Sequence, residues 1–245
     1  MQLVEAGNSK LAVHEWGDES AAPFLFWHAL GPGASAAYFA PVAERLASRG
    51  HRVLAVDGPG FGSSPLREAP DYALDALAGL VQNVVEGLKL APLVVAGHSW
   101  GGAVAVRYAA AHPEDVSALV LLDSGHIDYE ELPGVDAGRS AEAWVAEIRA
   151  RDGVAAEARG RAMHGLTERV SDTWPVIARA GIPTLLILAT LPPHGDQNRE
   201  HVPRFQQAVA HAEVRWAENA GHGIVDDVGP PLGDEIATWL AAQHH

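Results

Sequence analysis

One serine lies where the chain is expected to turn sharply. Ser99 belongs to the run Gly97-His98-Ser99-Trp100-Gly101, which fits the pattern Gly-x-Ser-x-Gly between an apolar β-type segment and a helix-type segment. A turn this tight brings neighbouring backbone very close, so the positions two before and two after the serine need to be small. The N–H of Trp100 would begin the following helix, where partial positive charge suits a developing oxyanion. The pattern predicts that Ser99 is a nucleophile and that Trp100 is one oxyanion donor.

A serine nucleophile needs a base, because its hydroxyl is too weakly acidic to attack an acyl carbon unaided at neutral pH. Among the 13 histidines, His222 fits this role best, since it follows the last predicted strand in a loop of small residues. His28 precedes the serine and is expected to help bind the substrate. His98 lies within the turn itself. The sequence therefore predicts His222 as the base.

The carboxylate that orients the base has two candidates. Asp196 follows a predicted strand at residues 183–189, and one helix and one strand fit between it and His222. Asp123 ends the strand that follows the helix of the serine turn. A carboxylate in this role would fix the tautomer of His222 and stabilise its imidazolium. We expect Asp196 to be the acid, with Asp123 as the alternative.

The walls of the site are expected to come from two further segments. The loop after the apolar strand at residues 23–27 would place the backbone N–H of Leu30 as the second donor of an oxyanion hole. Large apolar side chains are expected to line a substrate pocket, and these are Trp144, Trp174 and Met163.

Short apolar runs alternate with helix-type segments along most of the chain. Strands are expected at residues 23–27, 52–56, 92–96, 118–122, 183–189 and 212–217, with helices at 38–49, 71–88, 100–111, 202–211 and 231–242. An edge hairpin would pair residues 3–5 with 11–16. Strands that alternate with helices predict an α/β fold with a doubly wound, mostly parallel sheet covered by helices on both faces.

The pattern changes between residues 124 and 180, where helix-type segments replace buried strands. We expect this segment to be a small helical cap inserted over the edge of the sheet where open α/β sheets bind ligands. The predicted division is therefore a core of residues 1–123 and 181–243 and a cap of residues 124–180.

Bulk composition restricts the partners. The formal charge of −14 argues against nucleic acids and anionic membranes, which clustered Lys and Arg would hold. The chain has no cysteine. The N-terminus lacks the pattern of a signal peptide and no apolar run is long enough to span a membrane, so a cytoplasmic location is expected. The expected partner is a small-molecule substrate, and the expected state is a monomer or homodimer.

Several motifs together resemble the α/β-hydrolase fold superfamily over essentially the whole chain. The matching segments are His28-Ala29-Leu30-Gly31, Asp57-Gly58-Pro59-Gly60-Phe61-Gly62, Gly97-His98-Ser99-Trp100-Gly101 and Gly221-His222. The first is similar to the family's His-Gly-x-Pro loop and departs from it at Ala29 and Gly31. The resemblance implies a catalytic triad in the order Ser, acid, His and hydrolysis through a covalent intermediate, without metal or cofactor. A serine at the turn disfavours the family's dehalogenases and epoxide hydrolases, which use aspartate there.

The predicted function is a serine esterase of the carboxylesterase type. Ser99 would be acylated by an ester of a small or medium apolar substrate, and water activated by His222 would release the acid. The alternatives with the same triad are hydrolysis of lactones, of carbon–carbon bonds or of amides, and perhydrolysis. A different alternative is a non-catalytic ligand-binding protein that keeps the fold. A metalloenzyme is disfavoured, since no pair of histidines on a helix with a nearby carboxylate stands out.

Overall fold

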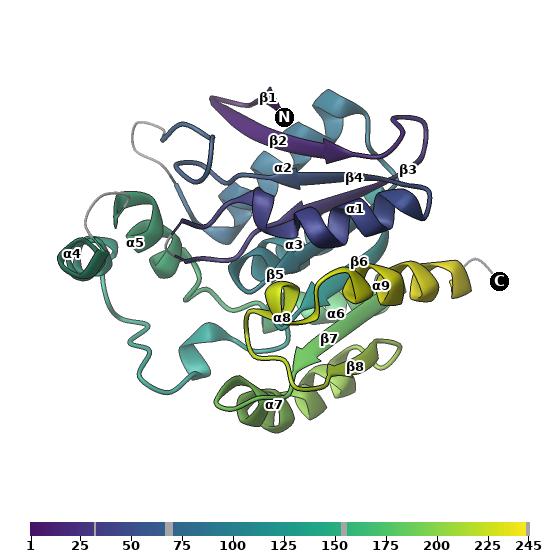
Figure 1. The fold of residues 1–245 in the computed structure, drawn as a ribbon. Helices are drawn as coiled ribbons and strands as arrows, with labels where there is room; N and C mark the ends of the chain where they lie inside the picture. Colours follow the sequence, from purple (N-terminus) through teal and green to yellow (C-terminus); the bar gives the residue numbers. More distant parts are fainter. Residues whose placement is uncertain (32, 67–70, 153–155, 244–245) are drawn as a thin grey trace.

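One sheet organises the molecule in the computed structural model, which describes residues 1–31, 33–66, 71–152 and 156–243. Its strand order is β1-β2-β4-β3-β5-β6-β7-β8 (Figure 1). The strands are β1 (Gln2–Ala6), β2 (Ser9–Trp16), β3 (Ala22–Trp27), β4 (His51–Val56), β5 (Leu93–His98), β6 (Val116–Leu122), β7 (Thr184–Ala189) and β8 (Glu213–Ala217). The pairs β1/β2 and β2/β4 are antiparallel and the others are parallel. The predicted edge hairpin and mostly parallel sheet are confirmed.

Helices cover both faces of the sheet (Figure 1). They are α1 (Ala40–Ser48), α2 (Leu74–Leu88), α3 (Trp100–Ala111), α4 (Ala141–Asp152), α5 (Ala156–Gly165), α6 (Trp174–Ala180), α7 (His194–Ala208), α8 (Ile224–Val228) and α9 (Pro230–Ala242). Short 3-10 turns lie at Ala36–Phe39, Pro113–Asp115, Tyr129–Glu131 and Ser171–Thr173. One core lies between the sheet and α2, α3, α6 and α7, and the other between the sheet and α1, α8 and α9.

The strand β3 shows why its sequence has no polar residue after Pro23. Successive side chains of a strand point to opposite faces. Phe24 and Phe26 therefore enter the core beneath α1 and α9, whereas Leu25 and Trp27 enter the core beneath α2 and α3. A strand covered on both faces reads as a continuous apolar run, which is how the sequence predicted it.

The segment between β6 and β7 contains helices, as its sequence pattern indicated, but these helices differ in what they pack against. The helices α4 and α5 pack on each other and lie at one side of the molecule (Figure 1). The helix α6 instead packs against α3 and α7, and its Ile177 is fully buried in the core. The boundaries 124–180 for a cap stay a prediction, and we propose that its separate part is α4 with α5.

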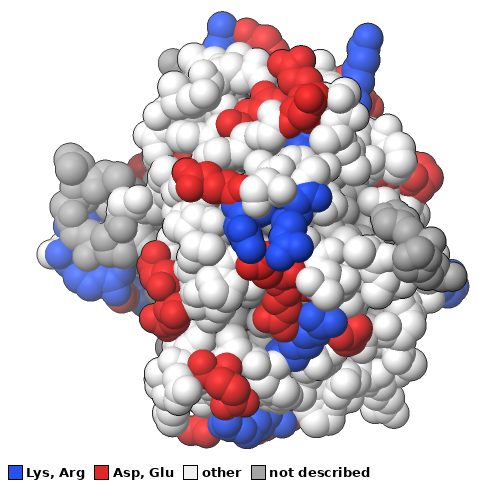
Figure 2. All heavy atoms as spheres, turned by 45° about the vertical axis from the view of Figure 1, so that its right-hand side comes forward, with Lys and Arg blue, Asp and Glu red and all other residues white. Residues whose placement is uncertain are grey.

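Charges of both signs are mixed on the surface. On the face that Figure 2 shows, blue and red side chains lie side by side. Arg45 and Arg49, for example, both bind the carboxylate of Asp234. Across the residues that the structure describes, no helix is long and apolar enough to cross a membrane.

Candidate active site

The serine turn has the backbone that its small residues predict. Ser99 lies between β5 and α3 with φ 55° and ψ −120°, a region that non-glycine residues adopt at a cost of about 1–3 kcal/mol. A Cβ on Gly97 would collide with the carbonyl of Gly101, and a Cβ on Gly101 would collide with the carbonyl of Trp27. The turn therefore packs directly against the end of β3, and it holds Ser99 partly exposed.

The side chain of His222 is bound to the carboxylate of Asp123. Nδ1 of His222 lies 2.6 Å from Oδ2 of Asp123, whose side chain is only 1% exposed. Burial by itself would raise the pKa of Asp123, but the hydrogen bond and charge of His222, together with hydrogen bonds from Ala189 and Asn198, hold this pKa below its usual value. The ionised carboxylate thus accepts a hydrogen bond from the Nδ1–H of His222, so that the lone pair of Nε2 can act as a base.

The structure moves this contact from Asp196, where we expected it, to Asp123. Asp196 lies in the first turn of α7, with its side chain 71% exposed and 3.3 Å from Nη1 of Arg199. The helix α7 begins at His194, two residues earlier than Asp196, and turns this carboxylate toward solvent. Asp123 instead follows β6 directly, at the sheet edge where β5 and β7 also end.

A second layer of hydrogen bonds fixes Asp123. Its Oδ1 accepts from the backbone N–H of Ala189 at 2.9 Å and from Nδ2 of Asn198 at 2.6 Å. The amide oxygen of Asn198 pairs with Nε2 of His126 at 3.1 Å, so that an unbroken chain leads from His126 through Asn198 and Asp123 to His222. Neither Asn198 nor His126 lies in a recognisable motif, so the sequence did not indicate a role for them.

The loop that carries His222 is held from below by His98. Nε2 of His98 lies 2.6 Å from the carbonyl oxygen of His222 and donates to it. Burial lowers the pKa of His98 to about 3, with a contribution from the charge of His222. His98 therefore stays neutral and acts as a backbone support beside Ser99.

His28 supports the loop of Leu30 rather than presenting a free ring to substrate. Its Nε2 accepts from the N–H of Gly58 at 2.9 Å, so its Nδ1 carries the proton and donates to the carbonyl of Ala29 at 2.7 Å. Burial lowers its pKa, and the residue is only 1% exposed. We expected His28 to bind the substrate; it lines one of the cavities beside His222, but backbone groups engage both of its ring nitrogens, so this role stays a prediction.

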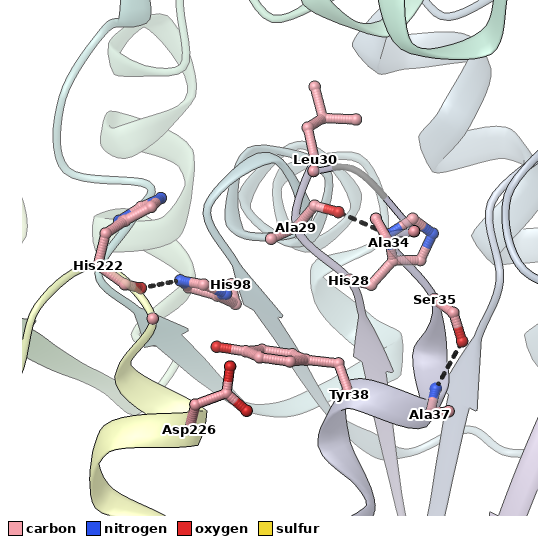
Figure 3. Close-up of a pocket in the computed structure, with 13 residues that line it drawn as sticks. His28, Ala29, Leu30, Ala34, Ser35, Ala37, Tyr38, His98, His222 and Asp226 are labelled. Atoms are coloured by element: carbon pink, nitrogen blue, oxygen red, sulfur yellow. Dashed lines mark hydrogen bonds between the residues drawn. The ribbon is translucent and has the colours of Figure 1, made fainter. Parts of the chain in front are cut away.

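Two cavities flank His222. A cavity of about 100 Å³ contacts Ser99, Asp123 and His222, with apolar walls from Ile127, Tyr129, Leu132, Leu166 and Val170. A second cavity of about 450 Å³ lies between the loop of Leu30 and the loop of His222. Figure 3 shows this cavity, with Leu30 at the top of the view, His222 and His98 at the left and Tyr38 below them.

The three residues expected to line an apolar pocket contact neither cavity. Trp174 is 2% exposed, donates from Nε1 to the carbonyl of Gly125 and packs edge-on against Phe205. Trp144 lies on α4, and Cζ of the Arg139 guanidinium lies 4.4 Å from the centre of the Trp144 ring. Met163 is on α5, and none of the three is among the described residues that line the cavities. The apolar wall comes instead from the segment 127–132 and from Leu166 and Val170.

Three side chains at the site could in principle bind a metal ion. Asp123, His194 and His222 offer ligand atoms within 4.8 Å of one another. However, the rings of His194 and His222 are stacked, 4.2 Å apart and parallel within 12°. Imidazole lone pairs lie in the ring plane, so those of two parallel stacked rings do not converge on one ion. The arrangement therefore suits hydrogen-bond and proton chemistry better than metal binding.

The fold and this site define the class of protein. The family model for the alpha/beta hydrolase fold matches residues 22–162, and the chain belongs to this family. A thermophilic esterase from Thermogutta terrifontis has a similar structure, with a TM-score of 0.82 at 19% identity over 100% of both chains. At this identity the likeness shows the fold alone.

Sequence relatives in the same family have differing activities. The chain is 26% identical over 269 residues to the sn-1-specific diacylglycerol lipase ABHD11 of Mus musculus, covering 92% of this chain and 83% of the relative. It is 30% identical over 149 residues to 2-hydroxy-6-oxo-2,4-heptadienoate hydrolase of Pseudomonas putida, covering 60% of this chain and 53% of the relative. The chain is thus a member of the alpha/beta hydrolase family, and these two relatives carry the names of a lipase and of a heptadienoate hydrolase.

Proposed function

We propose that the protein is a serine hydrolase that cleaves esters of neutral, apolar acyl groups through an acyl-enzyme. The observation that carries this proposal is the buried Asp123–His222 hydrogen bond at a cavity that Ser99 also lines. A nucleophile, a base within the same cavity and a carboxylate that orients the base are the parts that acyl transfer needs.

The proposed reaction begins at the hydroxyl of Ser99. Nε2 of His222 takes the proton as Oγ attacks the ester carbonyl, and the Asp123 carboxylate stabilises the imidazolium that forms. The N–H of Trp100, which has no partner within α3 because it begins this helix, would stabilise the oxyanion together with the N–H of Leu30. His222 then protonates the leaving alcohol and later activates the water that releases the acid.

Charge at the site supports a neutral substrate. None of the described residues that line either cavity is Lys or Arg, whereas Asp226 lines the larger cavity and Asp123 the smaller. A carboxylate on the substrate would therefore meet negative charge without a cation to pair with. This favours ester hydrolysis over cleavage of anionic substrates such as the heptadienoate named for the Pseudomonas putida relative.

The test compares matched substrates. Purified protein is assayed with p-nitrophenyl butyrate, with the p-nitrophenyl monoester of succinate and with the amide p-nitrobutyranilide. We expect turnover of the butyrate ester, at least tenfold slower turnover of the charged ester and little cleavage of the anilide. A preference for the succinyl ester would contradict the proposed neutral substrate. Hydrolysis of neither ester would favour the non-catalytic alternative.

A further inference from the structure

His194 lies against the ring of the proposed base, although neither the proposed triad nor the oxyanion hole includes it. It is the first residue of α7 and half-buried. Its ring is stacked on that of His222, with 4.2 Å between centroids and 12° between planes. The ring of His98 lies 4.8 Å from His222 as well, tilted by 48°. The imidazole of His222 is thus contacted by two other imidazoles.

The loop position of His222 makes such contacts consequential. His222 lies between β8 and α8, outside regular structure, and its side chain is 34% exposed. The hydrogen bond to Asp123 fixes only Nδ1. A single hydrogen bond can break as the ring moves to another staggered rotamer, and packing against the ring faces opposes that movement. His194 covers a face of this ring, while His98 bonds the backbone beneath it.

We propose that His194 is a positioning residue, which in its neutral form stacks on His222 and holds the ring in the orientation that reaches Ser99. This inference rests on the proposed function. Stacking requires that the two rings are not both cationic, because two imidazolium rings in face-to-face contact repel each other. A neutral ring beneath His222 is compatible with the imidazolium that forms during catalysis, since an aromatic face attracts a cation.

Charges around the pair agree with a neutral His194. Burial lowers the pKa of His194, the charge of His222 lowers it further, and the carboxylate of Asp123 acts in the opposite direction. His98 is neutral, with its pKa near 3. On α7 itself the nearest charges, Asp196 and Arg199, pair with each other at 3.3 Å, and Asp226 of α8 lies on the larger cavity.

The first test uses His194→Ala and His194→Phe with p-nitrophenyl acetate as substrate. Alanine removes the stacked ring, so kcat should fall by about threefold or more as His222 spreads over its three staggered wells, with KM nearly unchanged. Phenylalanine keeps a flat ring that cannot take a proton, so kcat should return to within about twofold of the unmodified protein. Gln206→Ala, an exposed change on the same helix, is the control, and the unfolding temperature of each variant excludes global damage.

The split between kcat and KM separates positioning from a general structural role. Loss of a ring that only stabilises the fold would lower the unfolding temperature and the fraction of active protein in both variants. Loss of a positioning ring instead lowers kcat of folded His194→Ala with KM nearly unchanged, and phenylalanine restores kcat because it restores the packed face of His222. Full kcat in His194→Ala, or equal loss in both variants, would overturn the proposal.

A measurement without substrate keeps this inference separate from the proposed function. The pKa of His194 is followed by ¹H–¹⁵N NMR in the unmodified protein and in His222→Phe, which retains a ring but loses its charge. We expect the pKa of His194 to rise in His222→Phe. An unchanged pKa would show that the two rings do not interact in solution, whatever the protein hydrolyses, whereas a raised pKa without ester turnover would remove only the proposed function.

Discussion

The carboxylate of Asp123 lies 2.6 Å from Nδ1 of His222, although 98 residues separate the two in the chain. They meet because the loops after β6 and β8 open at the same edge of a parallel sheet. The strand β7 ends between them, and its last residue, Ala189, donates its N–H to the carboxylate, as does Nδ2 of Asn198 from α7. The position of Asp123, the proposed acid, is therefore set by three neighbouring strand ends.

This relationship predicts different fates for two Asp→Asn variants. Asp123→Asn removes the charge that stabilises the imidazolium and changes the tautomer of His222, so kcat should fall by roughly 10⁴-fold. Asp196→Asn changes a solvated carboxylate whose ion pair with Arg199 is exposed, and such pairs contribute little to stability. This variant should keep kcat within about twofold of the unmodified protein. Ester turnover normalised to folded protein measures both, and a crippled Asp196→Asn beside an active Asp123→Asn would refute the assignment.

Asn198 should matter although it contacts no substrate in the proposed reaction. Asn198→Ala removes the 2.6 Å bond to Oδ1 of Asp123 and leaves Nε2 of His126 without its acceptor. Hydrogen bonds to charged groups contribute about 1.5–3 kcal/mol, so kcat/KM should fall by about tenfold or more. Steady-state kinetics and urea unfolding together measure the effect, and normal kinetics in a destabilised variant would reduce Asn198 to a purely structural role.

The sequence predicts some parts of this site better than others, for physical reasons. Ser99 and His222 are recognisable because the turn and the terminal loop impose local demands on residue size and order. The choice between Asp123 and Asp196 depends on where α7 begins, since that start turns Asp196 outward. No local pattern shows that beforehand, because a loop and the first turn of a helix admit similar residues.

Residues of the core and residues of the pocket are similarly hard to tell apart from the sequence. Trp174 and Met163 are of residue types that often line pockets, but aromatic and thioether side chains also fill hydrophobic cores. Trp174 proves to be buried with its Nε1 bound to the carbonyl of Gly125. The role of Asn198 depends on contacts made across 75 residues of chain, which only the folded structure shows.

Stability should rise with pH between about pH 4 and pH 6.5. Burial lowers the pKa of His98 to about 3 and that of His126 to about 4, whereas histidine in the unfolded chain titrates near about 6.5. Below pH 6.5 the unfolded state therefore binds more protons, and stability is lost as pH falls toward the folded values. The lowered pKa of Asp123 acts in the same direction, but only below the ordinary aspartate pKa of about 3.9.

Urea unfolding at pH 5 and pH 7.5 measures this dependence. We expect a larger free energy of unfolding at pH 7.5, and a smaller difference between the two pH values in His126→Gln, which lacks one of the buried imidazoles. Equal stability at both pH values would show that these rings are not held neutral in the folded protein.

The central claim is that Ser99 is a nucleophile activated by His222. Its most direct test is the rate of covalent labelling by a fluorophosphonate probe, with the modified residue located by mass spectrometry of peptides. We predict a single adduct on Ser99, no adduct in Ser99→Ala with the unfolding temperature nearly unchanged, and strongly slowed labelling in His222→Ala. Labelling of Ser99→Ala at the rate of the unmodified protein, or an adduct on another residue, would contradict the account.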